Sequence, residues 1–268
     1  MIALIDYKAG NLTSVKKALA AIGADVFVPN APGDLAGAAG IIVPGVGHFG
    51  ATRALDQPWI DAIRARVRDG RPLFGICLGM QWLFEGSEEA PDLPGLGLLS
   101  GRCYRLPTVR LKPDTTEDDG EVSPKPDTTE DDGEVSPKPD TTEDRTVPPK
   151  PGTTEDTSSG SVRLQADRDH GGVRLQPDRV VKIPHVGWNS LAIRRQGGLL
   201  DGVPTGAQVY FTHSYVAPDT ADTSASTDHG DTFAAVVQRG HIGGVQFHPE
   251  KSGDVGLRIL RNFVELAR

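Results

Sequence analysis

RPLFGICLGMQ, residues 71–81, is a short apolar run that ends in Gly-Ile-Cys-Leu-Gly just before a helical pattern begins. The run is typical of a buried strand, and Gly75 and Gly79 flank Cys77 as in a nucleophile elbow, where a sharp strand-to-helix turn presents one side chain. The start of such a helix offers backbone N–H groups and a positive dipole, which favour a thiolate and an oxyanion. The segment therefore predicts an α/β sheet with a candidate nucleophile at the end of one strand.

A lone cysteine fits a second interpretation equally well, because free cysteine is usually a small buried apolar residue. The chain has only Cys77 and Cys103, which is too few for a disulfide framework, and neither sits in a C-x-x-C pair. Cys103 lies in the strand-like stretch GRCYRL and is interpreted as a structural thiol. A catalytic role for Cys77 therefore requires a base and an orienting acid elsewhere.

The stretch GGVQFHPEKS, residues 243–252, supplies both groups at the end of another candidate strand. His248 can take the thiol proton and return it to the leaving group, while Glu250 holds the imidazole in the useful tautomer. Pro249 stiffens the turn between them. On its own, His248 would fit a surface or packing role equally well. Together with Cys77, the spacing predicts a Cys-His-Glu triad.

The third motif is IIVPGVGHFG, residues 41–50, in which a strand runs into Pro44-Gly45-Val46-Gly47. Backbone N–H groups in such a turn can face a nucleophile, and glycine permits close approach and unusual dihedral angles. A tight strand-to-helix turn would use the same residues for structural reasons alone. The neighbouring His48 is interpreted as a capping or surface residue.

Around these motifs, short β-rich runs alternate with helical patterns in the first hundred residues. The expected strands are IALID (2–6), DVFV (25–28), GIIVPG (40–45) and PLFGIC (72–77), and the expected helices are Leu12–Ile22 and Trp59–Val67. This alternation predicts βαβ units and a parallel sheet. Later runs, VYFTHSYV (209–216), FAAVVQRG (233–240) and IGGVQFHP (242–249), indicate an antiparallel or mixed part before a closing helix, Val255–Ala267. We expect a three-layer α/β domain with a mostly parallel, mixed central sheet.

The middle of the chain is repetitive. KPDTTEDDGEVSP occupies 112–124 and again 125–137, and degenerate copies follow. Residues 112–144 hold three lysines against thirteen acidic residues, so this stretch carries the acidity of a chain whose net charge is -8. With few large apolar side chains, it cannot offset its ordering entropy. We expect 107–179 to be a disordered insertion, and 1–106 and 180–268 to fold together as one domain. The alternatives are a solenoid or a partner-binding tail, but the copies lack the apolar positions that stacked repeats need.

Composition excludes several classes of protein. The chain has 268 residues, 37% of them hydrophobic, with no apolar run near the roughly 20 residues that cross a bilayer and no signal-like start. Outside the acidic repeats the charge is nearly balanced, which gives no basic surface for a nucleic acid. A cytoplasmic protein without membrane or nucleic-acid partners is expected.

The motifs PGVG, GICLGMQ and FHPE, in this order, resemble those of the class I glutamine amidotransferases. The resemblance covers nearly all of the core and none of the insertion. It implies hydrolysis of glutamine to glutamate and ammonia by a triad of Cys77, His248 and Glu250, without a cofactor or a metal. It also implies an oxyanion-binding set and a glutamine-binding set: Gly45, Val46, Gly47 and Leu78 for the first, and Gln81, Glu89, Ser214 and Tyr215 for the second.

Further stretches resemble one branch of that family: DYxxGN (6–11), GMQWLFEGSEE (79–89), PHVGWN (184–189), FTHSY (211–215) and HPEKS (248–252). Members of this branch pass ammonia to a (β/α)8-barrel cyclase subunit that makes imidazole glycerol phosphate and aminoimidazole carboxamide ribonucleotide in histidine biosynthesis. The resemblance implies a heterodimer whose contacts include Trp188, Asn189 and Lys251. It further implies that the oxyanion strand reorients when the partner binds its ligand.

Two departures from the branch stand out. Lys8 occupies a position in the opening motif where the family usually has glycine, and the 107–179 insertion falls directly before PHVGWN. Two other functions remain open: an amidotransferase serving a different acceptor, and a catalytically silent binding subunit of the same fold. The intact Cys77, His248 and Glu250 argue against the silent subunit.

Overall fold

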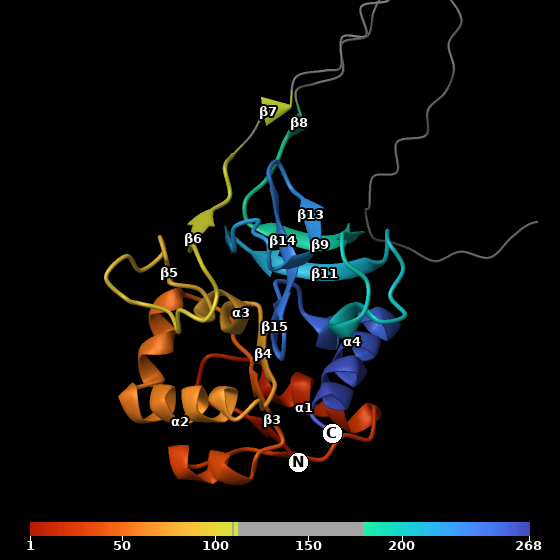
Figure 1. Cartoon of the computed structure of the whole chain (residues 1–268). Coiled ribbons are helices and arrows are strands. Elements are labelled where there is room, and N and C mark those ends of the chain that lie inside the picture. Colours follow the sequence, from red (N-terminus) through yellow and green to blue (C-terminus); the bar gives the residue numbers. More distant parts are fainter. Residues whose placement is uncertain (109, 112–178) are drawn as a thin grey trace, which may run out of the picture. The chain divides into compact units, whose positions relative to one another are not determined.

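The computed structural model describes residues 1–108, 110, 111 and 179–268. Nearly all of the expected insertion at 107–179 lies outside these residues, so its disorder stays a prediction. At its edges, β7 (Arg110–Leu111) pairs antiparallel with β8 (Arg179–Val180), which brings the two sides of the gap together (Figure 1). The described residues before and after the gap belong to one compact unit.

A mixed sheet of eight strands runs through the middle of this unit in the order β10-β13-β14-β15-β4-β3-β1-β2. Five neighbouring strands, from β15 to β2, are parallel, and the remaining three extend the sheet antiparallel. The bounds are β1 (Ile2–Leu4), β2 (Val26–Phe27), β3 (Gly40–Val43), β4 (Leu73–Ile76), β10 (Ala192–Ile193), β13 (Thr223–Asp228), β14 (Thr232–Arg239) and β15 (Ile242–Val245). The predicted mixed, mostly parallel sheet is confirmed.

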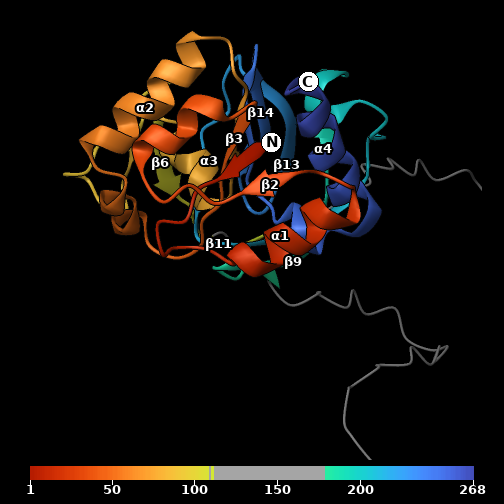
Figure 2. The same ribbon diagram turned by 90° about the horizontal axis from the view of Figure 1, so that it is seen from below.

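Helices cover both faces of the sheet. Figure 2 shows α2 (Gln57–Arg68) and α3 (Leu78–Trp82) on one side of the strands, and α1 (Leu12–Ala21) and α4 (Gly253–Leu266) on the other. Successive strand residues point to opposite faces, so Ile41 packs in the core under α2 while Ile42 packs in the core under α1 and α4. Two cores flank one sheet, which confirms the three layers. Four short 3-10 helices in the described part of the chain join these elements: η1 (Pro32–Gly37), η2 (Phe49–Ala54), η3 (Gly198–Leu200) and η4 (Pro249–Lys251).

Besides the β7–β8 pair, two small sheets of the described residues lie outside the main one. The first is an antiparallel ribbon of β9 (His185–Ser190) and β11 (Gln208–His213), and the second joins β12 (Tyr215–Val216), β6 (Arg102–Arg105) and β5 (Gly86–Ser87). The stretch expected as a single strand at 209–216 is therefore divided. The division falls at Ser214, whose carbonyl accepts the Leu106 N–H at 2.9 Å, so the chain leaves β9 there and continues along β6.

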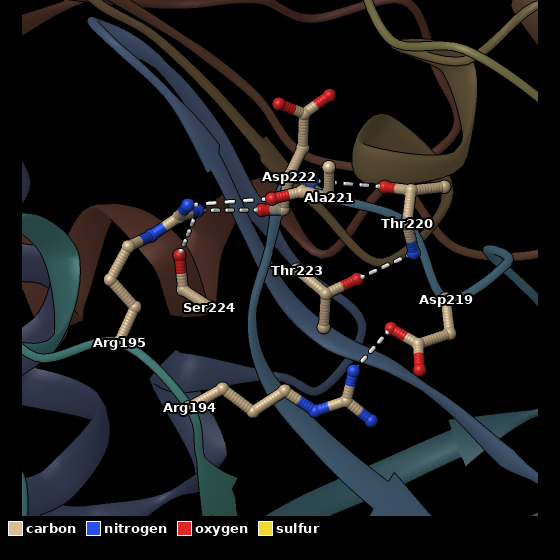
Figure 3. A network of polar contacts seen from close by, with 8 residues as sticks. All are labelled: Arg194, Arg195, Asp219, Thr220, Ala221, Asp222, Thr223 and Ser224. Carbon is tan, nitrogen blue, oxygen red and sulfur yellow. Dashed lines mark hydrogen bonds and ion pairs between the residues drawn. The ribbon is translucent and has the colours of Figure 1, made fainter.

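The antiparallel edge is held by two consecutive arginines at the end of β10 (Figure 3). Arg194 pairs with Asp219 at 2.7 Å, and Arg195 donates to the carbonyls of Ala221, Asp222 and Gln238 and to the Ser224 hydroxyl. A cavity of about 430 Å³ lies beside Arg195. Because this guanidinium is occupied by carbonyl oxygens, and the cavity lies opposite the carboxyl ends of the parallel strands, we interpret the region as a structural clamp. No helix in the described part of the chain is long and apolar enough to span a bilayer.

Candidate active site

Cys77 stands directly between β4 and α3, at the carboxyl edge of the parallel strands. Its φ of 52° and ψ of -108° are a strained conformation for a residue with a Cβ. The surroundings enforce it: a Cβ on Gly79 would overlap the Val43 carbonyl oxygen, and one on Gly75 would lie 2.5 Å from the Gly79 carbonyl oxygen. The flanking glycines are thus required because backbone packs against backbone at the elbow.

His248 and Glu250 come from the end of β15 and the start of η4. Nδ1 of His248 lies 2.8 Å from Oε1 of Glu250, and both side chains are almost completely buried. Burial alone lowers the His248 pKa, but the nearby Cys77 sulfur and the Glu250 carboxylate outweigh it and raise that pKa to about 10. The approach of Cys77 is looser than a completed hydrogen bond, since Nε2 has no partner at hydrogen-bonding geometry in the described residues. The arrangement therefore favours a protonated imidazole beside the Cys77 sulfur.

A cavity of about 320 Å³ opens at the nucleophile. Its lining contains most of the residues predicted for the site: Cys77, Val46, Gly47, Leu78, Gln81, Glu89, Ser214 and Tyr215. Gly45 lies behind the lining, against the Tyr7 hydroxyl. The lining also includes Pro184, Thr212 and His213, which were not among the predicted site residues although they lie in the quoted motifs PHVGWN and FTHSY. The structure therefore brings together residues from four separate parts of the chain.

Two of the predicted glutamine-binding side chains are held by hydrogen bonds. Gln81 Nε2 donates to the Tyr215 carbonyl at 2.8 Å and to Gln246 Oε1 at 3.1 Å. Glu89 Oε2 accepts the Phe49 N–H at 2.7 Å. Gln246, which was not predicted, also donates to the Cys77 sulfur at 3.7 Å and so links the cavity floor to the nucleophile.

The predicted oxyanion donors are occupied in this conformation. The Val46 N–H donates to the Ala9 carbonyl at 2.9 Å, and the Leu78 N–H donates to the Gly45 carbonyl at 3.3 Å. The Gly45 carbonyl and the Val46 N–H belong to the same peptide group. A rotation of this one peptide would therefore free the Leu78 N–H and turn the Val46 N–H at the same time, and the φ of 95° at Gly47 shows an unusual backbone next to it.

The segment before α1 packs against this peptide. The Tyr7 hydroxyl is buried without a hydrogen-bond partner among the described residues, and a Cβ on Gly45 would overlap it. Burial, and then the charge of Cys77, raise the Tyr7 pKa, so the hydroxyl keeps its proton. Lys8 adopts a φ of 64°, in the region that favours glycine, and its N–H and Nζ both bond to Asp6. The lysine thus keeps the turn that a glycine would allow.

Two of the three residues predicted to contact a partner, Trp188 and Lys251, lie in one surface patch around Tyr210. Trp188 is 58% exposed on β9, and its ring packs edge-on against Tyr210 of β11 with ring centroids 6.0 Å apart. Lys251, in η4 after the triad, places Nζ 5.7 Å from the Tyr210 ring centroid. Asn189 follows Trp188 on β9, but its side chain points to the opposite face of the strand and donates to the Asp228 carbonyl. Tyr210 was not predicted from the sequence, because an alternating strand pattern does not show which residue lies opposite on the neighbouring strand.

Two residues with expected structural roles also have clear surroundings. His48 is the N-cap of η2 and its Nδ1 accepts the Gly50 N–H at 2.9 Å, which confirms the capping role. Cys103 is fully buried, and burial raises its pKa, as suits a structural thiol. Within the described ranges, no group of three or more His, Cys, Asp or Glu side chains is arranged to hold a metal ion.

Comparisons with known proteins place this chain in a family. Residues 3–266 match the model for glutamine amidotransferase class-I. The chain is 35% identical to "Imidazole glycerol phosphate synthase subunit HisH" of Moorella thermoacetica, covering 100% of this chain and 95% of the relative. It is 38% identical to the protein of the same name from Geobacillus thermodenitrificans, covering 98% and 95%. Both alignments extend over essentially the whole length of the two chains.

Solved structures agree on the fold. One described as "Crystal structure of glutamine amidotransferase" superposes with a TM-score of 0.59 at 18% identity, covering 100% of this chain and 99% of the other. PurLQS from Thermotoga maritima gives a TM-score of 0.57 at 14% identity, covering 100% and 98%. The chain belongs to the glutamine amidotransferase class-I family and, within it, to the family of the imidazole glycerol phosphate synthase subunit HisH.

Proposed function

We propose that the chain hydrolyses glutamine to glutamate and ammonia and delivers the ammonia to a cyclase subunit with a (β/α)8 barrel, within a heterodimeric imidazole glycerol phosphate synthase of histidine biosynthesis. The observation that carries the proposal is the strained elbow that presents Cys77 in a cavity, together with the buried His248–Glu250 pair. The names of the full-length relatives support the choice of acceptor reaction.

The chemistry follows from the triad. The Cys77 thiolate attacks the side-chain amide carbon of glutamine, and His248 gives its proton to the departing ammonia. This leaves a thioester between Cys77 and the glutamyl group. His248 then takes a proton from water, which attacks the thioester and releases glutamate. Glu250 keeps the imidazole oriented through both steps by its 2.8 Å contact.

The conformation described here has little means to stabilise the tetrahedral intermediate. The Val46 and Leu78 N–H groups both donate to carbonyls, so they are unavailable to an oxyanion. Each of these two hydrogen bonds is worth about 0.5–1.5 kcal/mol net, which a partner or ligand can supply. We propose that the 45–46 peptide rotates when the cyclase subunit binds its nucleotide, which would keep the free chain nearly inactive.

The patch of Trp188, Tyr210 and Lys251, together with the neighbouring Asn189, is proposed as part of the surface that binds the cyclase. An exposed tryptophan packed on a tyrosine, with a lysine over the same ring, has the composition of an interface anchor. The patch begins one residue after Glu250, so a partner seated there is directly next to the triad.

The test is glutamate release from glutamine by the purified chain, alone, with its matching cyclase subunit, and with that subunit plus its nucleotide ligand. We expect hydrolysis to rise by at least about a hundredfold in the liganded complex, the scale on which an oxyanion donor acts. High activity of the free chain would contradict control by the partner. Absence of activity in all three samples would favour a silent binding subunit.

We also propose that 107–179 is an insertion that the core does not need. Leu111 and Arg179 are paired across an antiparallel ladder, so a short glycine-containing turn can connect the strands in place of residues 113–177. The shortened chain should keep its melting temperature and its activity in the complex. A loss of complex formation with the fold intact would show that the insertion takes part in docking.

A further inference from the structure

A cluster of three histidines lies next to Asn189 and the glutamine cavity and has no part in the chemistry above. His185 of β9 and His213 of β11 are paired across the ribbon and both are buried. His229 stacks on His185 with ring centroids 3.9 Å apart, and its Nε2 donates to the Lys182 carbonyl at 2.8 Å. Stacked rings whose nitrogens make hydrogen bonds do not form a metal site.

The neighbouring amide fixes which nitrogen of His185 carries the proton. Oδ1 of Asn189 accepts the Ser190 N–H at 2.8 Å, and Nδ2 donates to the Asp228 carbonyl at 2.8 Å. These two bonds settle the orientation of the amide, because exchanging O and N would break both. Nδ2 also lies 3.3 Å from Nε2 of His185. Since Nδ2 can only donate, Nε2 of His185 is an acceptor without a proton.

The same hydrogen-bond argument assigns the ring proton of His213. Burial, and then the charge of His229, lower the His185 pKa to about 4, so the ring is neutral and its proton is on Nδ1. That N–H lies 3.2 Å from Nε2 of His213 and donates to it. Burial also lowers the His213 pKa, which keeps this ring neutral with its own proton on Nδ1. Both imidazoles are thereby held in the Nδ1–H form, with a single direction of donation.

The last donor of this series of hydrogen bonds, His213 Nδ1, lies near the glutamine-binding segment. His213 Nδ1 is buried and approaches the backbone of Tyr215, without a completed hydrogen bond among the described residues. The Tyr215 carbonyl already accepts from Gln81, which reaches Gln246 and through it the Cys77 sulfur. A buried N–H without a partner is costly, so a small movement of β11 that completes the bond is favoured.

We propose that His185 and His213 are positioning residues, forming a neutral hydrogen-bond relay that runs from Asn189 on the partner-facing strand to the Tyr215 backbone, and so sets the glutamine-binding segment. The inference rests on the proposed function and adds a second connection between partner and site, separate from the 45–46 peptide. The β9–β11 ribbon forms a sheet separate from the main one, so docking on the exposed Trp188 can shift both strands, and with them Asn189, together.

The kinetic test compares two substitutions of similar size at one position. In the complex with cyclase and nucleotide, His213→Asn keeps a donor where Nδ1 was, whereas His213→Leu removes it. We expect the Leu variant to raise KM for glutamine by about tenfold with kcat little changed, and the Asn variant to stay within about threefold of the unmodified chain, the scale of one hydrogen bond. If the histidine only fills space beside Phe211 and Phe233, leucine is tolerated at least as well as asparagine. That opposite order would overturn the relay.

The second arm tests the connection to the surface. Asn189→Ala should raise KM in the unmodified background and have no further effect in the His213→Leu background, because the relay is already cut. Affinity for the cyclase is measured separately for each variant, so that weaker docking is not mistaken for a broken relay. Additive effects of the two substitutions on KM would contradict the proposal.

The tautomers themselves can be observed without any variant. Long-range 15N–1H NMR correlations of the full chain should show both rings neutral and protonated on Nδ1 at pH 7. An Nε2–H form of either ring would overturn the relay even if every variant misfolded. An incorrect proposed function would give a different result from an incorrect relay. The unmodified complex would then release no glutamate, while the histidine signals would still report the tautomers.

Discussion

The elbow around Cys77 and the peptide between Gly45 and Val46 lie side by side, yet they are held in different ways. At the elbow, backbone atoms of β3, β4 and α3 pack so closely that a Cβ on Gly75 or Gly79 would collide with a carbonyl oxygen. The 45–46 peptide makes two hydrogen bonds, one on each side, and its closest side-chain neighbour is the Tyr7 hydroxyl rather than backbone. Steric packing leaves one conformation, whereas two exchangeable bonds leave a choice between two.

This difference separates two parts of the chemistry. The nucleophile is presented permanently, because its strained backbone is enforced by the core. The stabilisation of the oxyanion depends on a peptide that can turn at a cost of a few kcal/mol. Such a site keeps its nucleophile in place at all times. Its rate is then set by a partner or ligand that stabilises the rotated 45–46 peptide.

The largest effect should come from removing the nucleophile. Cys77→Ala should reduce glutamine hydrolysis in the liganded complex by at least about a thousandfold, because the covalent step is lost. Cys103→Ala, which changes a thiol in the core behind Gln81, should leave most of the activity. Glutamate release measures both, and an equal loss in the two variants would contradict the assignment of the nucleophile.

The role of the 45–46 peptide can be tested by a substitution that leaves the elbow unchanged. Val46→Pro removes the N–H that is proposed to turn toward the oxyanion, and should lower kcat of the stimulated complex by about a hundred- to a thousandfold. Val46→Ala keeps the N–H and serves as the matched control. Melting temperatures of both variants show whether the fold survives. If the two variants have the same rate, the Val46 N–H is not an oxyanion donor.

The rigidity of the elbow is a prediction about stability. Gly79→Ala places a Cβ on the Val43 carbonyl oxygen and should cost about 3 kcal/mol or more in the free energy of unfolding. Gly33→Ala is the control, because a Cβ there meets nothing within 4 Å, and its effect should stay within about 0.5 kcal/mol. Denaturant titration compares them. Equal stability of the two variants would show that the elbow can relax.

The smallest effect concerns the hydroxyl that faces Gly45. Tyr7→Phe removes a buried group without a partner and should raise the free energy of unfolding by about 1 kcal/mol. In contrast, Tyr104→Phe removes a hydroxyl that donates to Asp231 at 2.9 Å. This substitution should lower the free energy of unfolding by about the same amount. A destabilised Tyr7→Phe chain would mean that this hydroxyl has a hydrogen-bond partner in solution.

Much of the fold could be predicted from the chain alone. The expected strands at 2–6, 40–45 and 72–77 and the helix at 12–22 correspond to β1, β3, β4 and α1, with shifts of a few residues at their ends. Periodicity was less informative after the insertion. β13, with the sequence TSASTD, is largely buried but has no large apolar side chains, so no pattern of alternation marked it. The division of 209–216 between two sheets depends on partners far away in the sequence.

The triad, the oxyanion set and the glutamine-binding set remain predictions from motifs, although the geometry is consistent with them. Cys77, His248 and Glu250 could be named because each sits in a local pattern whose chemistry needs those residue types. Gln246, Tyr210 and His213 could not be named in this way. Their roles come from what lies across a strand or a cavity, and a single sequence contains no record of such neighbours.

The sequence by itself determined the class of fold, the elbow and the candidate nucleophile with its base and acid. These depend on local backbone constraints and on short-range patterns of apolar residues, which the chain carries in consecutive positions. Only the tertiary structure decided that the Val46 N–H donates to the Ala9 carbonyl and that two buried histidines lead from Asn189 to the lining of the glutamine cavity. The direction of a peptide and the proton on a ring are set by hydrogen-bond partners that only folding brings into reach.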